Sequence, residues 1–463
     1  MNQDFLVVGG GVAGLFAAAL LKRKHADRNV IVLEQAPKPG GLLQSFDYGE
    51  HGCFDIGVHT FYETGNADID GFFQSVLPEE DWTYLTDFGR DMGGSWREGV
   101  LQYNTGYPDL TKLSGAEKAE YISDFFGNLT PATSHADDTD VMSYATQRYG
   151  PKIAEEVVRP AIEASQMIPA EQVHWLAAAI QRMDRVALLP TDAIDVLVQS
   201  PLFSGQLAFP NQLDYPEKYL PGKRAFYPRK FGMGRYIDAL VAQLEDSGIE
   251  ILTSARLTEL LSSDGRSTHA NITLKDGSTR QIATDHVYWA ASMPALAATL
   301  KLDMGSYRFD PPNQTVTCNL LTEKEPYSGG VFYATYLGHE RIRRLSFADN
   351  YCADARPNGS YPICVELTYP MGEDVEGVEA KVEGWLRDDG VIQPDNKVVF
   401  SKAEVLGTGY PCLSCKNISS MGAMRRDILA SDLTNLTPIG ILSNENLFFQ
   451  YDIIVHIHRL ITQ

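Results

Sequence analysis

The first 34 residues carry the feature that most restricts the fold of this chain. Phe5–Val8 is a short apolar run, Gly9–Gly11 follows at once, and residues 12–24 have the apolar spacing of a helix. Residues 29–33 are then almost wholly apolar, which is typical of a strand buried on both faces. A strand, a glycine turn, a helix and a second strand in about 30 residues predict a right-handed βαβ unit with parallel strands.

The glycines of this turn have the spacing of a nucleotide-binding fingerprint. Gly9, Gly11 and Gly14 form G-x-G-x-x-G after a predicted strand and at the start of a predicted helix. The first glycine makes the tight turn, the second lets a pyrophosphate approach the backbone, and the third lets helix and strand pack closely. Glu34 ends the second strand 20 residues after Gly14, where an acid binds ribose hydroxyls. The pattern predicts a dinucleotide with an unphosphorylated ribose, such as FAD or NAD.

The segment after Glu34 resembles a superfamily of FAD-dependent proteins. This group contains the flavin amine oxidases, protoporphyrinogen oxidases, phytoene desaturases and UDP-galactopyranose mutases, and its members wrap the FAD pyrophosphate with a Gly-Gly pair. Here the pair is Gly40-Gly41, followed by Leu42 where the family often has an arginine. The resemblance covers about residues 1–70 and 222–300, and weakly the C-terminus. It implies one non-covalently bound FAD, held in this region by Gly9, Gly11, Gly14, Glu34, Gly40 and Gly41.

A second matching segment bears on the flavin ring. Phe54–Phe61 looks like the family's D-x-G-x-H segment, which passes the ring, and it places Gly57 at the cofactor. His59 is then the catalytic candidate, because a histidine beside the ring can polarise a carbonyl, bind substrate or move a proton near neutral pH. The alternative is a histidine packed in a loop for structural reasons.

Two further matches concern the adenosine half of the cofactor. Residues 231–236 resemble the family's glycine loop before a long helix, which places Gly234 at the cofactor. Residues 253–257 resemble the end of the adenine-contacting strand, where the backbone of Leu257 would bind adenine.

The C-terminus departs from the family pattern of a strand, a glycine followed by Asp or Arg, and a helix. We expect a last strand at residues 443–449 and a short helix at 451–460, with no glycine between them. Either Asp452 replaces the acid that binds the ribityl chain, or the chain holds FAD less firmly.

Three residues are candidates for contact with a substrate. Tyr227 and Arg229 lie just before the glycine loop, where Arg229 and Lys230 suit a carboxylate or phosphate. A solvated basic patch is the alternative. Tyr410-Pro411 resembles the tyrosine–proline element that the family places in its substrate cavity, and an ordinary turn is the alternative.

No group of residues in the sequence indicates a metal site. Cys412-x-x-Cys415 has no second pair, and His456 and His458 would point to different faces of a helix. We therefore expect no metal and interpret the six cysteines as free thiols.

The remaining pattern predicts an α/β fold in which a Rossmann-like FAD-binding domain is assembled from discontinuous segments and joined to a mixed helical and β-sheet substrate domain. Residues 108–204 have helical spacing, and 310–410 are rich in strands and turns. We assign residues 1–85, 222–300 and 431–463 to the FAD-binding domain. We assign residues 86–221, mostly helical, and 301–430, strand-rich, to the substrate domain. The helical segment is expected to cover the flavin.

Charge and hydropathy restrict the partners. The chain has 39 Lys and Arg against 60 Asp and Glu, a net charge of −21, which repels phosphate backbones and makes nucleic acid an unexpected partner. Residues 12–21 are too short to span a bilayer, and the N-terminus does not resemble a signal peptide. We expect a cytoplasmic protein with a small-molecule substrate and no integral membrane segment; the sequence specifies no oligomeric state.

The resemblance implies an FAD-dependent oxidoreductase that transfers a hydride from a small organic substrate to flavin N5. The substrate is an amine, a cyclic compound such as a porphyrinogen, or a sugar derivative. One alternative is a redox-neutral nucleotide-sugar mutase resembling UDP-galactopyranose mutase, favoured by Gly57-x-His59-x-Phe61 and Arg229, although the family's G-R-x-x-x-Y stretch is absent. The second alternative is a non-catalytic protein with a flavin fold, suggested by the altered C-terminus.

Overall fold

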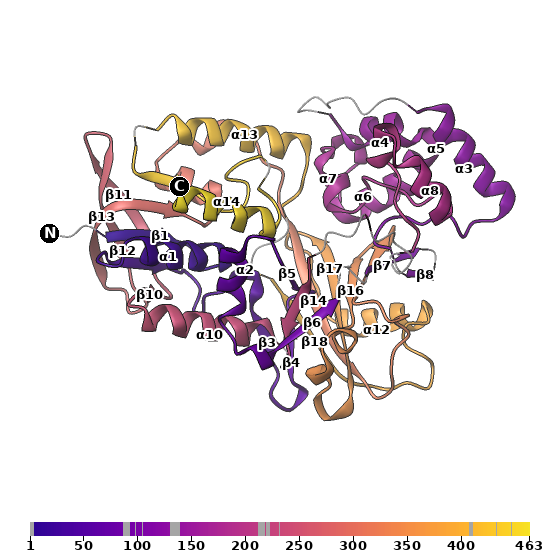
Figure 1. Cartoon of the computed structure of the whole chain (residues 1–463), viewed down its shortest axis with the longest axis horizontal. Coiled ribbons are helices and arrows are strands. Elements are labelled where there is room, and N and C mark those ends of the chain that lie inside the picture. Colours follow the sequence, from indigo (N-terminus) through magenta and orange to yellow (C-terminus); the bar gives the residue numbers. More distant parts are fainter. Residues whose placement is uncertain are drawn as a thin grey trace.

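The computed structural model describes residues 4–86, 93–97, 99–103, 105–129, 139–211, 218, 223–230, 232–406, 411–431, 433–445 and 447–463. Two large sheets lie next to each other, and a cluster of helices stands above the second one (Figure 1). Within the described residues, no helix has the length and apolarity that crossing a membrane requires.

The first sheet is Rossmann-like and collects its parallel strands from three distant parts of the chain. Val8 lies opposite Leu33, so the first two strands are parallel, as the βαβ pattern predicted. In order, the parallel strands are β10 (Glu250–Leu252), β2 (Val30–Leu33), β1 (Asp4–Val8), β13 (Thr279–Trp289) and β19 (Leu436–Pro438). The predicted α/β class and its discontinuous assembly are confirmed.

Alternate residues of the central strands enter two different hydrophobic cores, which explains why β1 and β2 are almost wholly apolar. Val7 and Val32 face the core made with the helices α1 (Val12–Lys24), α10 (Met233–Asp246) and α14 (Gln450–Thr462). Leu6 and Ile31 face the opposite core. That core is completed by β11 (Arg256–Ser263), β12 (Arg266–Thr273), α11 (Met293–Thr299) and α13 (Cys415–Leu429).

The prediction of a last strand at residues 443–449 is wrong. The strand that joins the sheet is Leu436–Pro438, and the described part of 443–449 forms turns that lead into α14. Leu447 and Phe448 are buried in this loop, with 5% and 9% of their surface exposed. Their apolar character therefore reflects burial in a loop and not pairing in a sheet. Gly440 follows this strand closely, although Ile441 stands where the family pattern has Asp or Arg.

The second sheet is mostly antiparallel, and its two faces differ. Val316, Cys318 and Leu320 point to an apolar core under α12 (Val378–Asp388). Thr317 and Asn319, on the opposite face, are polar and have no exposed surface. In order, the strands are β18 (Val398–Val405), β14 (Asn313–Thr322), β17 (Tyr361–Pro370), β16 (Ile342–Ser346), β15 (Tyr333–Leu337), β7 (Gly93–Arg97) and β8 (Val100–Tyr103).

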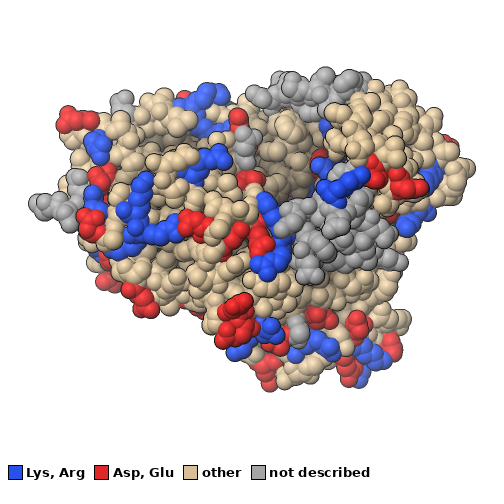
Figure 2. All heavy atoms as spheres, viewed as in Figure 1, with Lys and Arg blue, Asp and Glu red and all other residues tan. Residues whose placement is uncertain are grey.

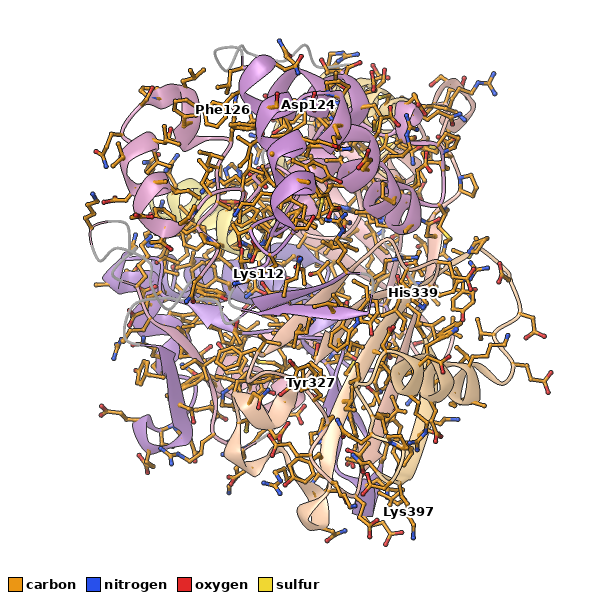
Figure 3. All side chains as sticks on the ribbon, turned by 90° about the vertical axis from the view of Figure 1, so that its right-hand side faces the viewer. Lys112, Asp124, Phe126, Tyr327, His339 and Lys397 are labelled. Carbon is orange, nitrogen blue, oxygen red and sulfur yellow. The ribbon has the colours of Figure 1, made fainter. Side chains whose placement is uncertain are left out.

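The helical cluster has its own hydrophobic core. Figure 3 shows it at one end of the molecule, where Asp124 and Phe126 are labelled, with Lys397 near the other end. The Asp124 carboxylate accepts a hydrogen bond of 2.7 Å from the backbone N–H of Lys152, which ties two helices together. The cluster contains α3 (Gly115–Gly127), α4 (Val141–Tyr149), α5 (Pro151–Ile153), a π-helical turn (Ala154–Val158), α6 (Arg159–Gln166), α7 (Leu176–Ile180), α8 (Thr191–Leu197) and α9 (Pro201–Ser204).

Short elements connect the two sheets. They are β3 (Ser45–Asp47), β4 (Cys53–Asp55), β5 (Phe61–Tyr62), α2 (Ala67–Gln74), β6 (Trp82–Thr86) and β9 (Ala225–Pro228). The predicted D-x-G-x-H segment runs from β4 to β5 and therefore lies where the two halves meet. The boundaries of the predicted domains remain a prediction.

Candidate functional site

The glycines of the first turn have different surroundings. A side chain on Gly9, whose φ is +108°, would press on the backbone nitrogen of Ala291 at 2.9 Å. A side chain on Gly14 would overlap the carbonyl oxygen of Gly9, so this glycine permits the close packing of helix on strand. The Cβ position of Gly11 has no atom within 4 Å. The turn therefore leaves open space at the one glycine that the fingerprint assigns to the pyrophosphate.

A second glycine turn lies against the first. The backbone N–H of Gly40 donates to the carbonyl of Gly10 at 2.7 Å, and Gly41 lies next to the Cα of Gly11. Helix α1 begins here, and its N-cap, Gly11, contributes no side-chain hydrogen bond. The positive end of the helix thus meets two turns without bulky side chains, which is an arrangement that suits a phosphate.

Glu34 lies at the edge of these turns. Its carboxylate accepts hydrogen bonds from the backbone N–H groups of Gly10 at 2.8 Å and Ala36 at 2.7 Å. Each carboxylate oxygen has a further lone pair that can accept from a ribose hydroxyl. The backbone N–H of Ala255 donates to the Glu34 carbonyl at 2.9 Å, which brings the segment leading to Leu257 to the same place.

A buried carboxylate that the sequence analysis did not single out joins four segments. Asp55 accepts hydrogen bonds from the hydroxyls of Ser45 and Tyr227, both at 2.6 Å, and from the backbone N–H of Met233 at 2.8 Å. Burial raises the pKa of Asp55, while these hydrogen bonds oppose the rise. Asp55 thereby fixes the start of α10 against the segment that leads to His59. The sequence feature that could have identified Asp55 is its place as the acid of the D-x-G-x-H segment.

The predicted substrate contacts Tyr227 and Arg229 lie elsewhere than expected. Tyr227 has no exposed surface, because its ring is packed in the core and its hydroxyl serves Asp55. The Arg229 guanidinium donates to the backbone carbonyls of Glu80 and Trp82. These placements do not support contact of either side chain with a substrate, and Tyr410 lies outside the described residues.

Gly234 and Gly57 have packing roles in the structure. The N–H of Gly234 donates to the Ser45 hydroxyl at 2.8 Å. Gly57 has φ of +79°, and a side chain there would collide with the carboxylate of Glu366. Gly234, on α10, thus holds its segment against Ser45, and Gly57 allows its segment to pack closely against Glu366 of the second sheet.

His59 lies beside an ion pair of the second sheet. Arg344 on β16 and Glu366 on β17 pair through two contacts, with Nε to Oε1 at 2.5 Å and Nη2 to Oε2 at 2.9 Å. Burial, followed by the positive charge of Arg344, lowers the pKa of His59 to about 4. The imidazole is therefore neutral near pH 7, with one nitrogen as donor and the other as acceptor.

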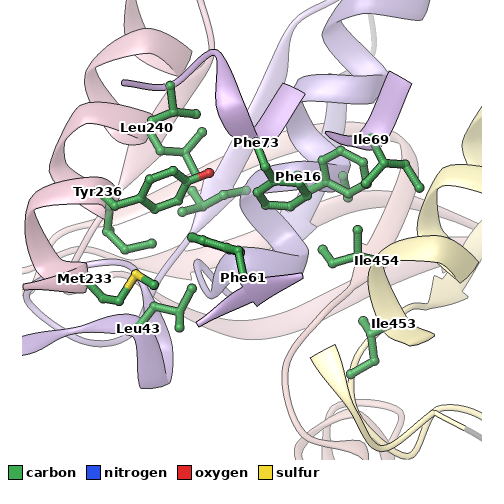
Figure 4. Close-up of a cluster of buried hydrophobic side chains, with 14 of the residues drawn as sticks. Phe16, Leu43, Phe61, Ile69, Phe73, Met233, Tyr236, Leu240, Ile453 and Ile454 are labelled. Atoms are coloured by element: carbon green, nitrogen blue, oxygen red, sulfur yellow. The ribbon is translucent and has the colours of Figure 1, made fainter. Parts of the chain in front are cut away.

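A cavity of about 550 Å³ opens at His59. Phe61 and Ile454 belong both to its wall and to the buried cluster shown in Figure 4, so this wall is fixed by the core. The first turn of α14 contributes Gln450 and Tyr451. The complete lining is Val58, His59, Thr60, Phe61, Tyr62, Thr64, Asp70, Phe73, Arg182, Phe226, Tyr333, Arg344, Phe449, Gln450, Tyr451 and Ile454. Arg182, Arg344 and Tyr333 were missed, because no local pattern marks them.

Asp452 lies in the first turn of α14 and is not part of the cavity lining. Partial burial raises the pKa of its carboxyl group. Its placement beside a bound ribityl chain remains a prediction.

The described residues contain no cluster of His, Cys, Asp and Glu able to hold a metal ion. Cys412 and Cys415 are not joined by a disulfide bond, and Cys412 is buried. His458 contacts Asp68 at 2.7 Å, a surface pair between α14 and α2.

Comparison with known proteins agrees with this geometry. Residues 7–76 match the family described as the NAD(P)-binding Rossmann-like domain. The "FAD-dependent oxidoreductase dbaF" of Emericella nidulans is 26% identical over 125 residues, which are 27% of this chain and 24% of that protein. The "inactive all-trans-retinol 13,14-reductase" of Danio rerio is 40% identical over 77 residues, 16% of this chain and 12% of that protein. The chain thus matches a quarter or less of these relatives' length.

Solved structures extend the similarity to the whole chain. A reduced UDP-galactopyranose mutase superposes with a TM-score of 0.72 at 14% identity, covering 100% of this chain and 94% of that chain. A double mutant of putrescine oxidase with a redesigned cofactor site superposes with a TM-score of 0.61 at 13% identity, covering 99% and 98%. The chain has the fold of the FAD-dependent, amine-oxidase-like superfamily, and the predicted resemblance is confirmed at that level.

Proposed function

We propose that the protein is an enzyme that binds one FAD without a covalent bond and oxidises a small organic molecule. The observation that carries this proposal is the open space at Gly11, between two glycine turns and the uncapped start of α1. A backbone cradle that a single Cβ would fill is what a pyrophosphate requires, and neighbouring Gly9 and Gly14 are by contrast closed by packing.

The residues at these turns would hold the adenosine and pyrophosphate. Gly11 and Gly41 offer backbone approach, Glu34 offers a carboxylate to the ribose, and the backbone at Leu257 offers hydrogen bonds to adenine. Bound FAD would supply the acceptor for a hydride at flavin N5, which no side chain can provide.

The chain's own work would take place in the cavity. A neutral His59 can donate a hydrogen bond from one ring nitrogen and accept at the other, so it can hold a substrate oxygen or nitrogen and accept a proton from it. The aromatic side chains of the wall exclude water from the reacting atoms. The cytoplasmic location and the small-molecule substrate belong to the same proposal.

A redox-neutral mutase is the second candidate. It is favoured by the superposition with UDP-galactopyranose mutase, which extends over the whole chain. A non-catalytic protein was suggested by the lack of a glycine after the expected last strand. The structure supports this alternative less, because Gly440 follows the strand that is actually last in the sheet. A side chain there would approach the Ala290 carbonyl oxygen to 2.7 Å, so the position is used for close packing as the fold requires.

The test begins with the visible spectrum of the purified protein and the flavin released by boiling. We expect yellow protein that releases FAD, and a Gly11→Val variant that stays folded but is colourless, because the valine occupies the pyrophosphate space. Gly384→Val is the matched control, since its Cβ also meets no atom within 4 Å but lies on α12, away from the turns.

Release of FMN would contradict the proposal, because FMN lacks the adenosine that Glu34 would hold, and so would a Gly11→Val protein with full flavin content. Bleaching by candidate substrates without added reductant supports oxidation. Activity that appears only after reduction with dithionite supports the mutase.

A further inference from the structure

Two arginines reach the cavity from parts of the chain that are far apart in sequence. Arg182 follows α7 in the helical cluster, and Arg344 lies on β16 of the second sheet. Asp70 is the one carboxylate among the lining residues. The chain as a whole carries a charge of −21, and acidic side chains lie among basic ones over both halves of the face in Figure 2. A cavity wall with two guanidinium groups is therefore unlike the average surface of this protein.

The carboxylate of Asp70 is already engaged. It accepts hydrogen bonds from the backbone N–H of Thr64 at 2.6 Å, the hydroxyl of Thr64 at 2.7 Å and the backbone N–H of Gly65 at 3.0 Å. These bonds hold the turn before α2. A positively charged amine entering the cavity would have to compete with three local donors for this acceptor, and it would also meet the two arginines.

Both arginines are held in position. Glu366 binds Arg344 along one edge of the guanidinium, while 32% of the Arg344 side chain remains exposed. Glu366 is not part of the cavity lining. Arg182 has a φ of 58° because it ends α7 in a left-handed C-cap, in which the N–H of Met183 donates to the Ala178 carbonyl at 2.6 Å. Its guanidinium lies 5.7 Å from the ring of Tyr107.

Seven of the other lining residues are aromatic. Tyr333 lies under the Arg344 guanidinium, with its ring centroid 5.8 Å from the central carbon. The start of α14 lies at the cavity, because Phe449 and the first two helical residues line it, and Phe449 provides no side-chain cap to the positive end of the helix. The aromatic lining residues are Phe61, Tyr62, Phe73, Phe226, Tyr333, Phe449 and Tyr451.

We propose that this cavity selects a substrate with a flat aromatic or conjugated ring and an anionic group such as a carboxylate, and that it discriminates against a cationic amine. Arg182 and Arg344 bind the anion, the aromatic side chains pack on the ring, and Asp70, already bound by three local donors, is a weak acceptor for an ammonium group. The inference rests on the proposed function, whose substrate it narrows: among the amine, cyclic and sugar classes, it disfavours the amine.

The test uses two probes of similar size and opposite charge. Benzoate and benzylamine are titrated near neutral pH into the purified protein with its bound flavin, and heat release and the visible difference spectrum are recorded. We expect benzoate to bind at least about tenfold more tightly than benzylamine, because a guanidinium–carboxylate bond contributes at least that factor. Added sodium chloride should lower the affinity for benzoate and leave the affinity for benzylamine nearly unchanged.

Variants identify the side chains. Arg182→Gln should weaken benzoate by about 10- to 100-fold, the range for one charge-assisted hydrogen bond. Arg344 is changed together with its partner, as Arg344→Gln with Glu366→Gln, so that no uncompensated carboxylate remains, and a similar loss is expected. Arg280→Gln is the control, because that arginine pairs with Glu250 at the edge of the other sheet.

Three results would overturn the proposal: benzylamine binding as tightly as benzoate, neither probe binding, or unchanged benzoate affinity in both arginine variants. The outcome is separable from that of the proposed function. Colourless protein that still prefers benzoate through Arg182 supports the anion site while FAD binding fails. Yellow protein without the preference leaves the flavin proposal standing and overturns this one.

Discussion

The side where we propose nucleotide binding (the nucleotide side) and the cavity where we propose substrate binding (the substrate side) are built from different materials. The nucleotide side uses mainly backbone groups. They belong to two glycine turns, the start of α1 and the end of β2, all between residues 9 and 41. The substrate side uses side chains from separate elements, including His59, Asp70, Arg182 and Arg344.

The difference has a physical cause. Backbone can approach a phosphate only where several consecutive residues lack bulk, so such a site leaves a compact pattern in the sequence. A cavity needs only that its side chains meet in space, and each can come from any element that the fold brings near. The two sides should therefore respond differently to substitution.

The strongest test of the backbone side is Gly14→Ala. The added methyl group would overlap the Gly9 carbonyl oxygen, which is part of a turn closed by β13 and cannot move freely. We expect a loss of about 3 kcal/mol or more in the free energy of unfolding, at the upper end of overpacking effects, with loss of flavin. Thermal melting and flavin content measure both effects.

Gly11→Ala is the matched comparison for that prediction, since its methyl group meets no atom within 4 Å in the protein. With flavin removed from both proteins, it should melt like the wild type, because bound FAD would otherwise stabilise the wild type further. Equal melting temperatures for the Gly11→Ala and Gly14→Ala variants would show that packing does not distinguish the two glycines.

The His59→Ala variant tests the substrate side, where side chains form the cavity. FAD should largely remain bound, because its predicted contacts lie at the glycine turns, but reduction of the flavin by substrate should slow by about 10²- to 10⁴-fold. Anaerobic stopped-flow kinetics measure the rate, and a melting curve serves as the control. Normal reduction with a lowered melting temperature would mean that His59 only packs.

Glu34→Ala should have a smaller effect, because one carboxylate shares the binding of FAD with many backbone groups. Loss of a charge-assisted hydrogen bond to the ribose should weaken FAD by about 1–3 kcal/mol. Flavin titration of the apoprotein measures the change. Equal affinity of wild type and Glu34→Ala for FAD would exclude the ribose contact.

A last expected effect is a pH dependence of stability due to His59. Its pKa in the folded chain is about 4, below the usual 6.5. Between these values the unfolded chain binds a proton that the folded chain does not, so the free energy of unfolding falls as the pH drops through this window. Melting curves of the wild type and His59→Gln from pH 7 to pH 4 should converge or cross as the pH falls. Parallel curves would show that His59 titrates normally.

Local sequence motifs predicted much of the structure of the nucleotide side. Strand, turn, helix and acid appear where the sequence predicted them, because each depends on neighbours within a few residues. The last strand was misplaced because Leu447 and Phe448 are apolar for burial in a loop, which looks the same in sequence as burial in a sheet. Tyr227 was assigned to substrate from its position before a glycine loop, while its partner, Asp55, lies 172 residues away.

By itself, the sequence determined the βαβ unit, the glycine spacing and the acid at the end of β2, since backbone conformation and strand pairing follow from local residue types. Only the tertiary structure decided that Gly11 faces open space while Gly14 is closed, that Asp55 joins four segments, and that Arg182 and Arg344 meet the same cavity as His59. Those facts depend on which distant segments pack together, and packing is a property of the whole chain that no short pattern records.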